Sequence, residues 1–281
     1  MVTSTNPLAK HFRQPVLYIK LPTEGQYWEE GSLELPANGE MPVYPMTAKD
    51  EIMIRTPDAL LNGDSVVQVI ENCCPSIKDA WKIPGPDVDA ILVAVRIASY
   101  GPDMGIDTKC PYCEHDNRHE IELPPILHSY KCPDYNKTKE INDLKIKLKP
   151  LNYYQQNKRN TSRFEEDRIM MTINDESIND DTKMKMFNEQ LERLVDINIS
   201  TVAASTQFIE LPNGDRVIDP DHILEYFQNC DNGVFKKLLG HIETITKDTE
   251  VPKVNLACES CEKEYSTGLE FDYANFFDVS S

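Results

Sequence analysis

The chain has 281 residues, of which 40% are hydrophobic and 27% are charged. This composition is typical of a globular protein with one large domain or two modest ones. The formal net charge at pH 7 is −18, which argues against a nucleic-acid-binding surface, because phosphate contacts need a basic field.

Residues 1–14 are predicted to form a flexible arm. They lack the hydrophobic segment of a signal peptide. The longest apolar run, at residues 91–98, is too short to span a membrane and contains Arg96. We therefore predict a reduced cytosolic chain with no membrane-spanning segment, in which paired cysteines bind metal more often than they form disulfides.

Residues 15–104 are predicted to form an N-terminal domain that begins with strands and continues with helices. Short strands are expected at Val16–Leu21, Ser32–Leu35 and Val43–Tyr44. Asn38-Gly39 is a hairpin signal between the last two of them.

Four helices are predicted in the second half of this domain, at about 48–54, 57–61, 65–74 and 87–100. Thr47 and Asp50 resemble a capping box before the first helix, and Pro57 suits the first turn of the second. A loop is expected at residues 81–87. The fourth helix is defined best, because several apolar residues share one face at helical spacing: Val88, Ile91, Leu92, Val95 and Ala98.

Residues 105–150 contain the first of two cysteine pairs, Cys110-Pro-Tyr-Cys113, and a strand that follows it. The pair lies between two stretches that resemble strands, with a tight polar turn beside it. This is the pattern of a zinc-ribbon knuckle. Residues 144–151 alternate apolar and basic side chains, as expected of a half-exposed strand.

Residues 151–205 are predicted to be an inserted helical hairpin that carries many charges. Its helices are expected at Tyr153–Met171 and Thr182–Ile197, on either side of an acidic break at residues 174–181. The side chains expected to face inward in the second helix are Met186, Leu191, Leu194 and Val195. The charges favour a solvated surface, and a partner-binding arm is the alternative.

Residues 206–281 are predicted to contain a hairpin, two helices, the second knuckle and an aromatic tail. The hairpin spans 208–218 around Asn213-Gly214. Asp219 is expected to cap the first of the two helices, and the second covers about 232–246. The second cysteine pair, Cys258-Glu-Ser-Cys261, again lies between two strand-like stretches. The apolar tail, residues 271–277, is expected to dock into the core or onto a partner.

These elements predict an α+β fold with a small N-terminal β region, a helical middle and an inserted helical segment. The two knuckles form a four-cysteine module like that of a zinc ribbon. Together they supply the four sulfur ligands of one tetrahedral structural Zn²⁺, namely Cys110, Cys113, Cys258 and Cys261. The ion would close a loop of roughly 140 residues, which is tolerable because the entropy cost of loop closure grows slowly with length.

Two alternatives to a shared zinc stay open. The first is that the pairs pack in separate places as inert cysteines. The second is a thioredoxin-like redox motif, although such a motif normally lies between a strand and a helix. His115 and His119 follow the first pair, but four cysteines make them unnecessary as ligands. The remaining cysteines are expected to be buried small hydrophobic side chains: Cys73, Cys74, Cys132 and Cys230.

We find no catalytic motif in the sequence. It lacks G-x-S-x-G, a P-loop, G-x-G-x-x-G and H-E-x-x-H. Four thiolates fill every coordination position of a tetrahedral zinc and leave none for a water. We therefore predict that the protein is not an enzyme and that the zinc is a structural clamp.

Several stretches resemble the T-even-type phage baseplate hub proteins. They are residues 21–28, 43–51, 56–63, the helix end at 96–101 that leads to Cys110, residues 148–153, and Cys258–Cys261 with Phe276-Phe277. The resemblance extends from about residue 15 to 277, and its distinctive part is roughly 43–113. It implies a non-enzymatic myovirus tail protein that helps to build the central hub of the baseplate, either as a hub component or as an assembly factor.

The same resemblance implies other baseplate hub proteins as partners, with self-association as a further possibility. It also implies a location in the host cytoplasm during assembly, with the baseplate of the virion as the other location. The alternative function is a zinc-ribbon nucleic-acid-binding or transcription-related phage protein. The net charge of −18 argues against that alternative and against a nucleic-acid partner.

Overall fold

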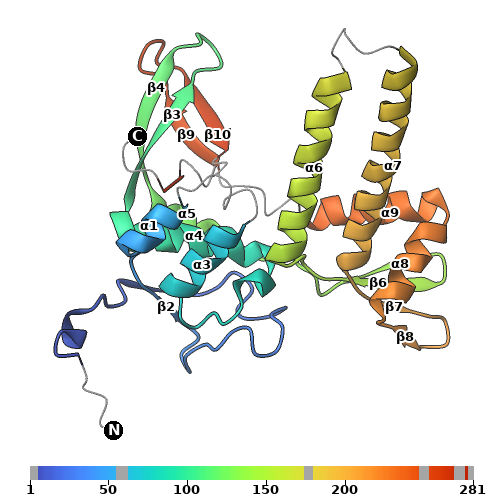
Figure 1. The fold of residues 1–281 in the computed structure, drawn as a ribbon, viewed down its shortest axis with the longest axis horizontal. Coiled ribbons are helices and arrows are strands. Elements are labelled where there is room, and N and C mark those ends of the chain that lie inside the picture. Colours follow the sequence, from blue (N-terminus) through green and yellow to red (C-terminus); the bar gives the residue numbers. More distant parts are fainter. Residues whose placement is uncertain (1–5, 55–62, 174–179, 247–252, 269–275, 278–281) are drawn as a thin grey trace. The chain divides into compact units, whose positions relative to one another are not determined.

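The computed structural model describes residues 6–54, 63–173, 180–246, 253–268 and 276–277. The chain divides into two compact units (Figure 1). Unit 1 comprises residues 1–80, 87–131 and 251–281, and unit 2 comprises residues 81–86 and 132–250. Both cysteine pairs therefore belong to unit 1. The mixed α/β fold predicted from the sequence, with small hairpin sheets and a four-cysteine cluster, is confirmed.

The N-terminal strands of unit 1 pair differently from the sequence prediction. Strands β1 (Leu17–Ile19) and β2 (Met41–Val43) form a two-stranded antiparallel sheet. The strand predicted at Ser32–Leu35 is wrong, because this stretch makes only an isolated bridge, from Leu33 to Ile77. The turn at Asn38-Gly39 exists, but it joins no hairpin, since the strand that follows it pairs with β1.

Four α-helices of this part of the chain are described: α1 (Ala48–Ile54), α3 (Asp64–Cys73), α4 (Gly85–Tyr100) and α5 (Leu123–Ser129). The predicted stripe of α4 is buried. The predicted loop at 81–87 is partly wrong, because a 3-10 helix covers Ala80–Lys82 and α4 already begins at Gly85. The helix predicted at 57–61 lies outside the described residues. Helix α5 was not predicted; prolines stand in its first turn, where a missing N–H does no harm.

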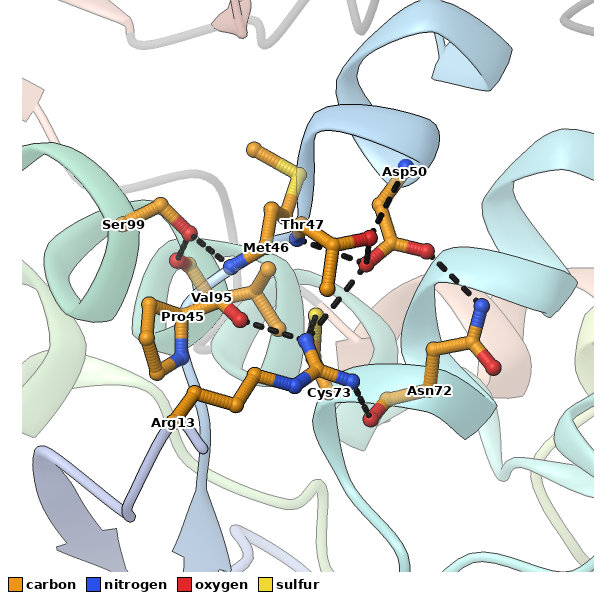
Figure 2. A network of polar contacts seen from close by, with 9 residues as sticks. All are labelled: Arg13, Pro45, Met46, Thr47, Asp50, Asn72, Cys73, Val95 and Ser99. Atoms are coloured by element: carbon orange, nitrogen blue, oxygen red, sulfur yellow. Dashed lines mark hydrogen bonds and ion pairs between the residues drawn. The ribbon is translucent and has the colours of Figure 1, made fainter. Parts of the chain in front are cut away.

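A polar network fastens the N-terminal arm to the helices of unit 1 (Figure 2). Arg13 donates to the carbonyl oxygens of Pro45 and Asn72, and its Nη1 lies 3.4 Å from the Asp50 carboxylate. Asp50 also accepts hydrogen bonds from Thr47 N (2.8 Å) and Asn72 Nδ2 (2.7 Å). Desolvation raises the pKa of Asp50, but these donors and Arg13 outweigh it and lower that pKa overall. The predicted capping box is confirmed, since Asp50 N donates back to Thr47 Oγ1.

The aromatic end of the chain is described at two residues, Phe276 and Phe277, which are 3% and 0% exposed. The Arg96 guanidinium, from α4, lies 5.5 Å from the Phe276 ring centre. These two residues are thus buried within the chain itself, as expected of a tail that docks into the core. Residues 271–275 lie outside the described residues.

Unit 2 is built on a four-stranded antiparallel sheet in the order β5-β6-β7-β8. Its strands are β5 (Thr138–Ile141), β6 (Leu144–Leu148), β7 (Thr206–Glu210) and β8 (Arg216–Val217). Helices α8 (Pro220–Asn229) and α9 (Asn232–Thr246) follow the sheet. The predicted cap of α8 is confirmed, because the Asp219 carboxylate accepts from the backbone N–H groups of Asp221 and His222.

A long helical hairpin is inserted between β6 and β7 (Figure 1). It consists of α6 (Tyr153–Ile173) and α7 (Asp180–Ala204), which pack against each other. The inward face predicted for α7 is wrong in part. Leu191 and Val195 are 45% and 56% exposed, whereas Gln190 is 4% exposed. Across the described residues, no helix combines the length and apolar character needed to cross a bilayer.

Candidate metal centre

Two antiparallel hairpins of unit 1 carry the cysteine pairs, and they lie side by side in Figure 1. The first consists of β3 (Asp103–Lys109) and β4 (Asp116–Glu122). The second consists of β9 (Lys253–Ala257) and β10 (Glu264–Gly268). Each pair occupies the turn between its two strands, so both predicted knuckles are confirmed as hairpins.

The two turns have the same backbone geometry. In the first, Cys110 N donates to His115 O (2.9 Å) and Glu114 N donates to Cys110 O (3.0 Å). The same two bonds, both 3.0 Å, recur in the second turn at Cys258, Lys263 and Glu262. The residue that follows each second cysteine has a positive φ, 58° at Glu114 and 59° at Glu262. This left-handed residue turns the chain back toward the partner strand while keeping both sulfurs on one side.

Backbone N–H groups also point at the sulfur of the first cysteine of each pair. Tyr112 N lies 3.4 Å from Cys110 Sγ, and Ser260 N lies 3.4 Å from Cys258 Sγ. Hydrogen bonds from N–H groups favour the charged form of a thiol. Each turn is thus suited to hold a thiolate, which is the form of cysteine that binds metal.

The four sulfurs form one compact cluster. The Sγ atoms of Cys110 and Cys261 are 3.7 Å apart, and those of Cys113 and Cys258 are 3.6 Å apart. All four lie within 4.8 Å of one another. A regular tetrahedron of sulfurs, each about 2.3 Å from a central ion, has edges of about 3.8 Å. The spacing therefore fits a single ion, and the alternative that the pairs pack in separate places is wrong.

The electrostatics of the cluster favour a bound cation. The backbone N–H of Cys261, with help from Ser260 N and neighbouring thiols, lowers the pKa of Cys258 to about 6. At Cys113 the backbone bond to His115 lowers the pKa, but desolvation and the thiols of the other three cysteines raise it to about 12. Without a cation the cluster thus favours a thiolate at Cys258 and resists one at Cys113. A divalent cation removes that resistance, because it neutralises two of the four negative charges.

Two polar side chains that the sequence prediction missed join the hairpins beside the cluster. Asn117 is 3% exposed; its Oδ1 accepts from Glu259 N (2.9 Å) and its Nδ2 donates to His115 O (3.0 Å). Tyr265, 7% exposed, places its hydroxyl 2.6 Å from Thr108 Oγ1. Each stands seven residues after the first cysteine of its own pair. Aligning the two hairpins on their cysteines would have identified both as equivalent inward positions.

The other histidines and cysteines considered from the sequence lie outside the cluster. His115 is exposed, and His119 Nε2 lies 3.1 Å from the Tyr265 hydroxyl. In the described part of the chain, the group with metal-binding geometry consists of the four knuckle cysteines. Cys73 and Cys74 are fully buried as predicted, whereas Cys132 and Cys230 are only half-buried, contrary to the prediction.

Comparison with known proteins finds one family. Residues 29–278 match the family model described as T4 bacteriophage base plate protein. No curated protein and no solved structure matches the chain. The matched range contains both cysteine pairs and the inserted helical hairpin.

Proposed function

Because this chain belongs to the T4 bacteriophage base plate protein family, we propose that it is a non-enzymatic component or assembly factor of the central hub of a contractile-tail baseplate. The family match covers residues 29–278, and it is the observation that carries the proposal. A member of this family is a structural phage tail protein. The finer assignment to the hub rests on the resemblance of residues 43–113 to hub proteins.

We further propose that the four cysteines hold a structural Zn²⁺. The spacing of the four sulfurs supports this proposal, as do the N–H groups that point at Cys110 and Cys258. Zinc is the common ion for four thiolates in tetrahedral arrangement. When bound, the ion supplies a cross-link between the middle and the end of the chain. Because four protein ligands fill its coordination positions, it would act as a clamp and not as a Lewis acid for substrate.

The expected partners are other subunits of the baseplate hub, encountered in the host cytoplasm during assembly and retained in the virion if the protein is a hub component. The acidic charge supports protein partners with basic surfaces over nucleic acid. The first of the two hairpins that carry the cysteines is itself acidic. Residues 103–122 contain six acidic side chains and two lysine or arginine side chains, which is a poor surface for phosphate contacts.

The proposal is tested by affinity purification of the tagged chain from phage-infected cells, with mass spectrometry of what is retained. We expect enrichment of baseplate subunits over a tag-only control, and one zinc per chain by elemental analysis. A gel-shift assay with DNA and RNA is expected to show no specific complex. Specific nucleic-acid binding, or the absence of any tail protein among the retained proteins, would overturn the assignment in favour of the zinc-ribbon alternative.

A further inference from the structure

Helix α7 carries a row of exposed apolar side chains. Met184, Phe187, Leu191 and Val195 are 64%, 38%, 45% and 56% exposed. Their spacing of three, four and four residues places them within an arc of about 80° on the helix, along about 17 Å of its length. Single exposed apolar residues are normal on protein surfaces, but a continuous row of this kind marks an interaction site.

Within the same stretch α7 buries a different side: Gln190 is 4% exposed and lies about 100° around the helix from the middle of the row. Val202, which is 1% exposed, continues the line of the row five turns beyond Met184, so this line is buried at the end of α7 and exposed from Met184 to Val195. Helix α7 packs against α6 and α8 in unit 2. The helical hairpin is therefore already attached to its own unit, and its apolar row adds a second contact surface. Pairs of antiparallel helices commonly complete such a surface by forming a four-helix bundle.

Charges beside the row indicate what covers it. Lys185 and Glu192 are both exposed and stand seven residues, or two turns, apart, so they flank the row on the same side. If a second α7 packed in parallel register, the two-fold axis along the helices would place these residues and their copies on opposite sides of the interface, and the charges would not meet. If it packed antiparallel, each Lys185 would face a Glu192. The apolar row and the two charges are arranged symmetrically about one point of the helix. The midpoints of Lys185 with Glu192, Phe187 with Leu191, and Met184 with Val195 all fall within one residue of position 189.

We infer that this row, Met184, Phe187, Leu191 and Val195, is a self-association surface. Two copies of the chain pair through their α7 helices, antiparallel, about a two-fold axis near residue 189, and their α6–α7 hairpins form a four-helix bundle. Such a contact is isologous and closes on itself as a dimer. The inference is independent of the proposed hub function, since it rests on α7 alone.

The first test is the oligomeric state of the full zinc-loaded chain by sedimentation velocity over a range of concentrations. We expect the wild type to reach twice the chain mass of 32.1 kDa. Leu191→Glu places a charge in the centre of the row and is expected to weaken the dimer at least about tenfold, since it buries an unpaired carboxylate. The matched control is Ile218→Glu, at a 70% exposed apolar position elsewhere in unit 2, and it is expected to dimerise like the wild type.

The second test distinguishes the orientation of the two helices. In an antiparallel pair, Lys185→Glu or Glu192→Lys alone sets like charges against each other twice, and each is expected to weaken the dimer severalfold at low salt. The double variant restores both opposite-charge pairs and is expected to regain wild-type affinity. A parallel pair would not respond in this way, because Lys185 and Glu192 would then lie across the interface from neither of their copies in the partner helix.

Three outcomes would overturn the inference: a wild type that stays a single chain at all concentrations, a Leu191→Glu dimer as strong as the wild type, or charge variants that show no restoration. Circular dichroism and zinc content identify a variant that has failed to fold. None of these three results affects the hub proposal, which is judged by the proteins retained from infected cells.

Discussion

Asp87 shows how a single buried side chain fixes part of unit 1. It lies near the start of α4 and is 0% exposed. Its oxygens accept hydrogen bonds from Thr23 N, Thr23 Oγ1 and Trp28 Nε1, at 2.8, 2.5 and 2.8 Å. All three donors are neutral. Desolvation therefore dominates and raises the pKa of Asp87 to about 6, although the bonds from Thr23 and Trp28 oppose the shift.

This shift predicts a pH dependence of stability. The pKa of Asp87 is higher in the folded than in the unfolded chain, whose ordinary value is 3.8, so the folded protein holds the proton more tightly. The contribution of this carboxyl is full below its unfolded pKa and is lost as the pH rises through about 6. We expect the free energy of unfolding of the wild type, relative to Asp87→Asn, to fall by roughly 2–3 kcal/mol between about pH 4 and pH 7. Urea unfolding of both proteins across this pH range measures the difference in their free energies of unfolding. A difference that does not change with pH would contradict the prediction.

The knuckle cysteines give the second prediction at this scale. Cys110→Ser or Cys258→Ser replaces a thiolate by a hydroxyl, and each is expected to lose the bound zinc and most of the stability linked to it, since metal-binding free energy is folding free energy in such sites. Thermal melting and elemental analysis measure both effects. Cys230→Ser, outside the cluster and half-buried, is the control and should keep its zinc. A wild type that melts at the same temperature with and without a chelator would be incompatible with a structural metal.

At the scale of elements, local sequence patterns predicted the structure well wherever the conformation of a segment depends mainly on its own residues. Helix α4 follows from its apolar stripe, and the knuckles follow from two cysteines set in a polar turn between strands. The prediction of a strand at Ser32–Leu35 was wrong because a strand needs a second segment to pair with. The strand that follows in the chain, Met41–Val43, pairs with β1 instead. Strand β5 was missed although Asn142, with φ 57°, turns the chain directly into β6.

Helix α7 illustrates a different limit of sequence reasoning. Its apolar residues are correctly placed on a helix, but the pattern covers too wide an arc to reveal which part faces the protein. In the folded protein, tertiary packing buries the side of α7 that contains Gln190, whereas Leu191 and Val195 stay exposed. Likewise, the four sulfur ligands could be named from spacing alone, whereas Asn117 could not, because its role depends on Glu259 in a hairpin 142 residues away.

The contact between the hairpins predicts an effect of Asn117→Ala. The substitution leaves Glu259 N without its acceptor and removes the donor to His115 O, which should cost about 1–3 kcal/mol in a buried setting. Because the four sulfurs are untouched, the variant is expected to bind one zinc per chain but to release it more readily to a competing chelator. Asn255→Ala, at an exposed position of β9, is the control. Equal zinc retention by the two variants would show that Asn117 does not position the knuckles.

At the scale of the whole molecule, the chain order and the compact units do not coincide. Unit 1 is completed by residues 251–281, which return after the chain has built nearly all of unit 2. Its two hairpins are two-stranded sheets, and sheets of that size are marginal in water unless something else holds them. Unit 2 instead has a four-stranded sheet, followed by two helices with buried residues such as Phe227 and Leu238. The two units should therefore depend on the metal to different degrees.

We predict that removal of zinc loosens the hairpins of unit 1 and leaves the sheet of unit 2 intact. Without a cation the four sulfurs have no common ion, so β9–β10 is held to β3–β4 more weakly, by contacts such as those of Asn117 and Tyr265. Hydrogen exchange measured with and without a chelator should show amides of residues 103–122 and 253–268 exchanging at least about tenfold faster, which corresponds to a loss of about 1.4 kcal/mol of protection. Amides of β6 and β7 are the internal control and should change little. Uniform acceleration in both units would show that the metal supports the fold as a whole, and no change in either would show that the cysteines do not need it.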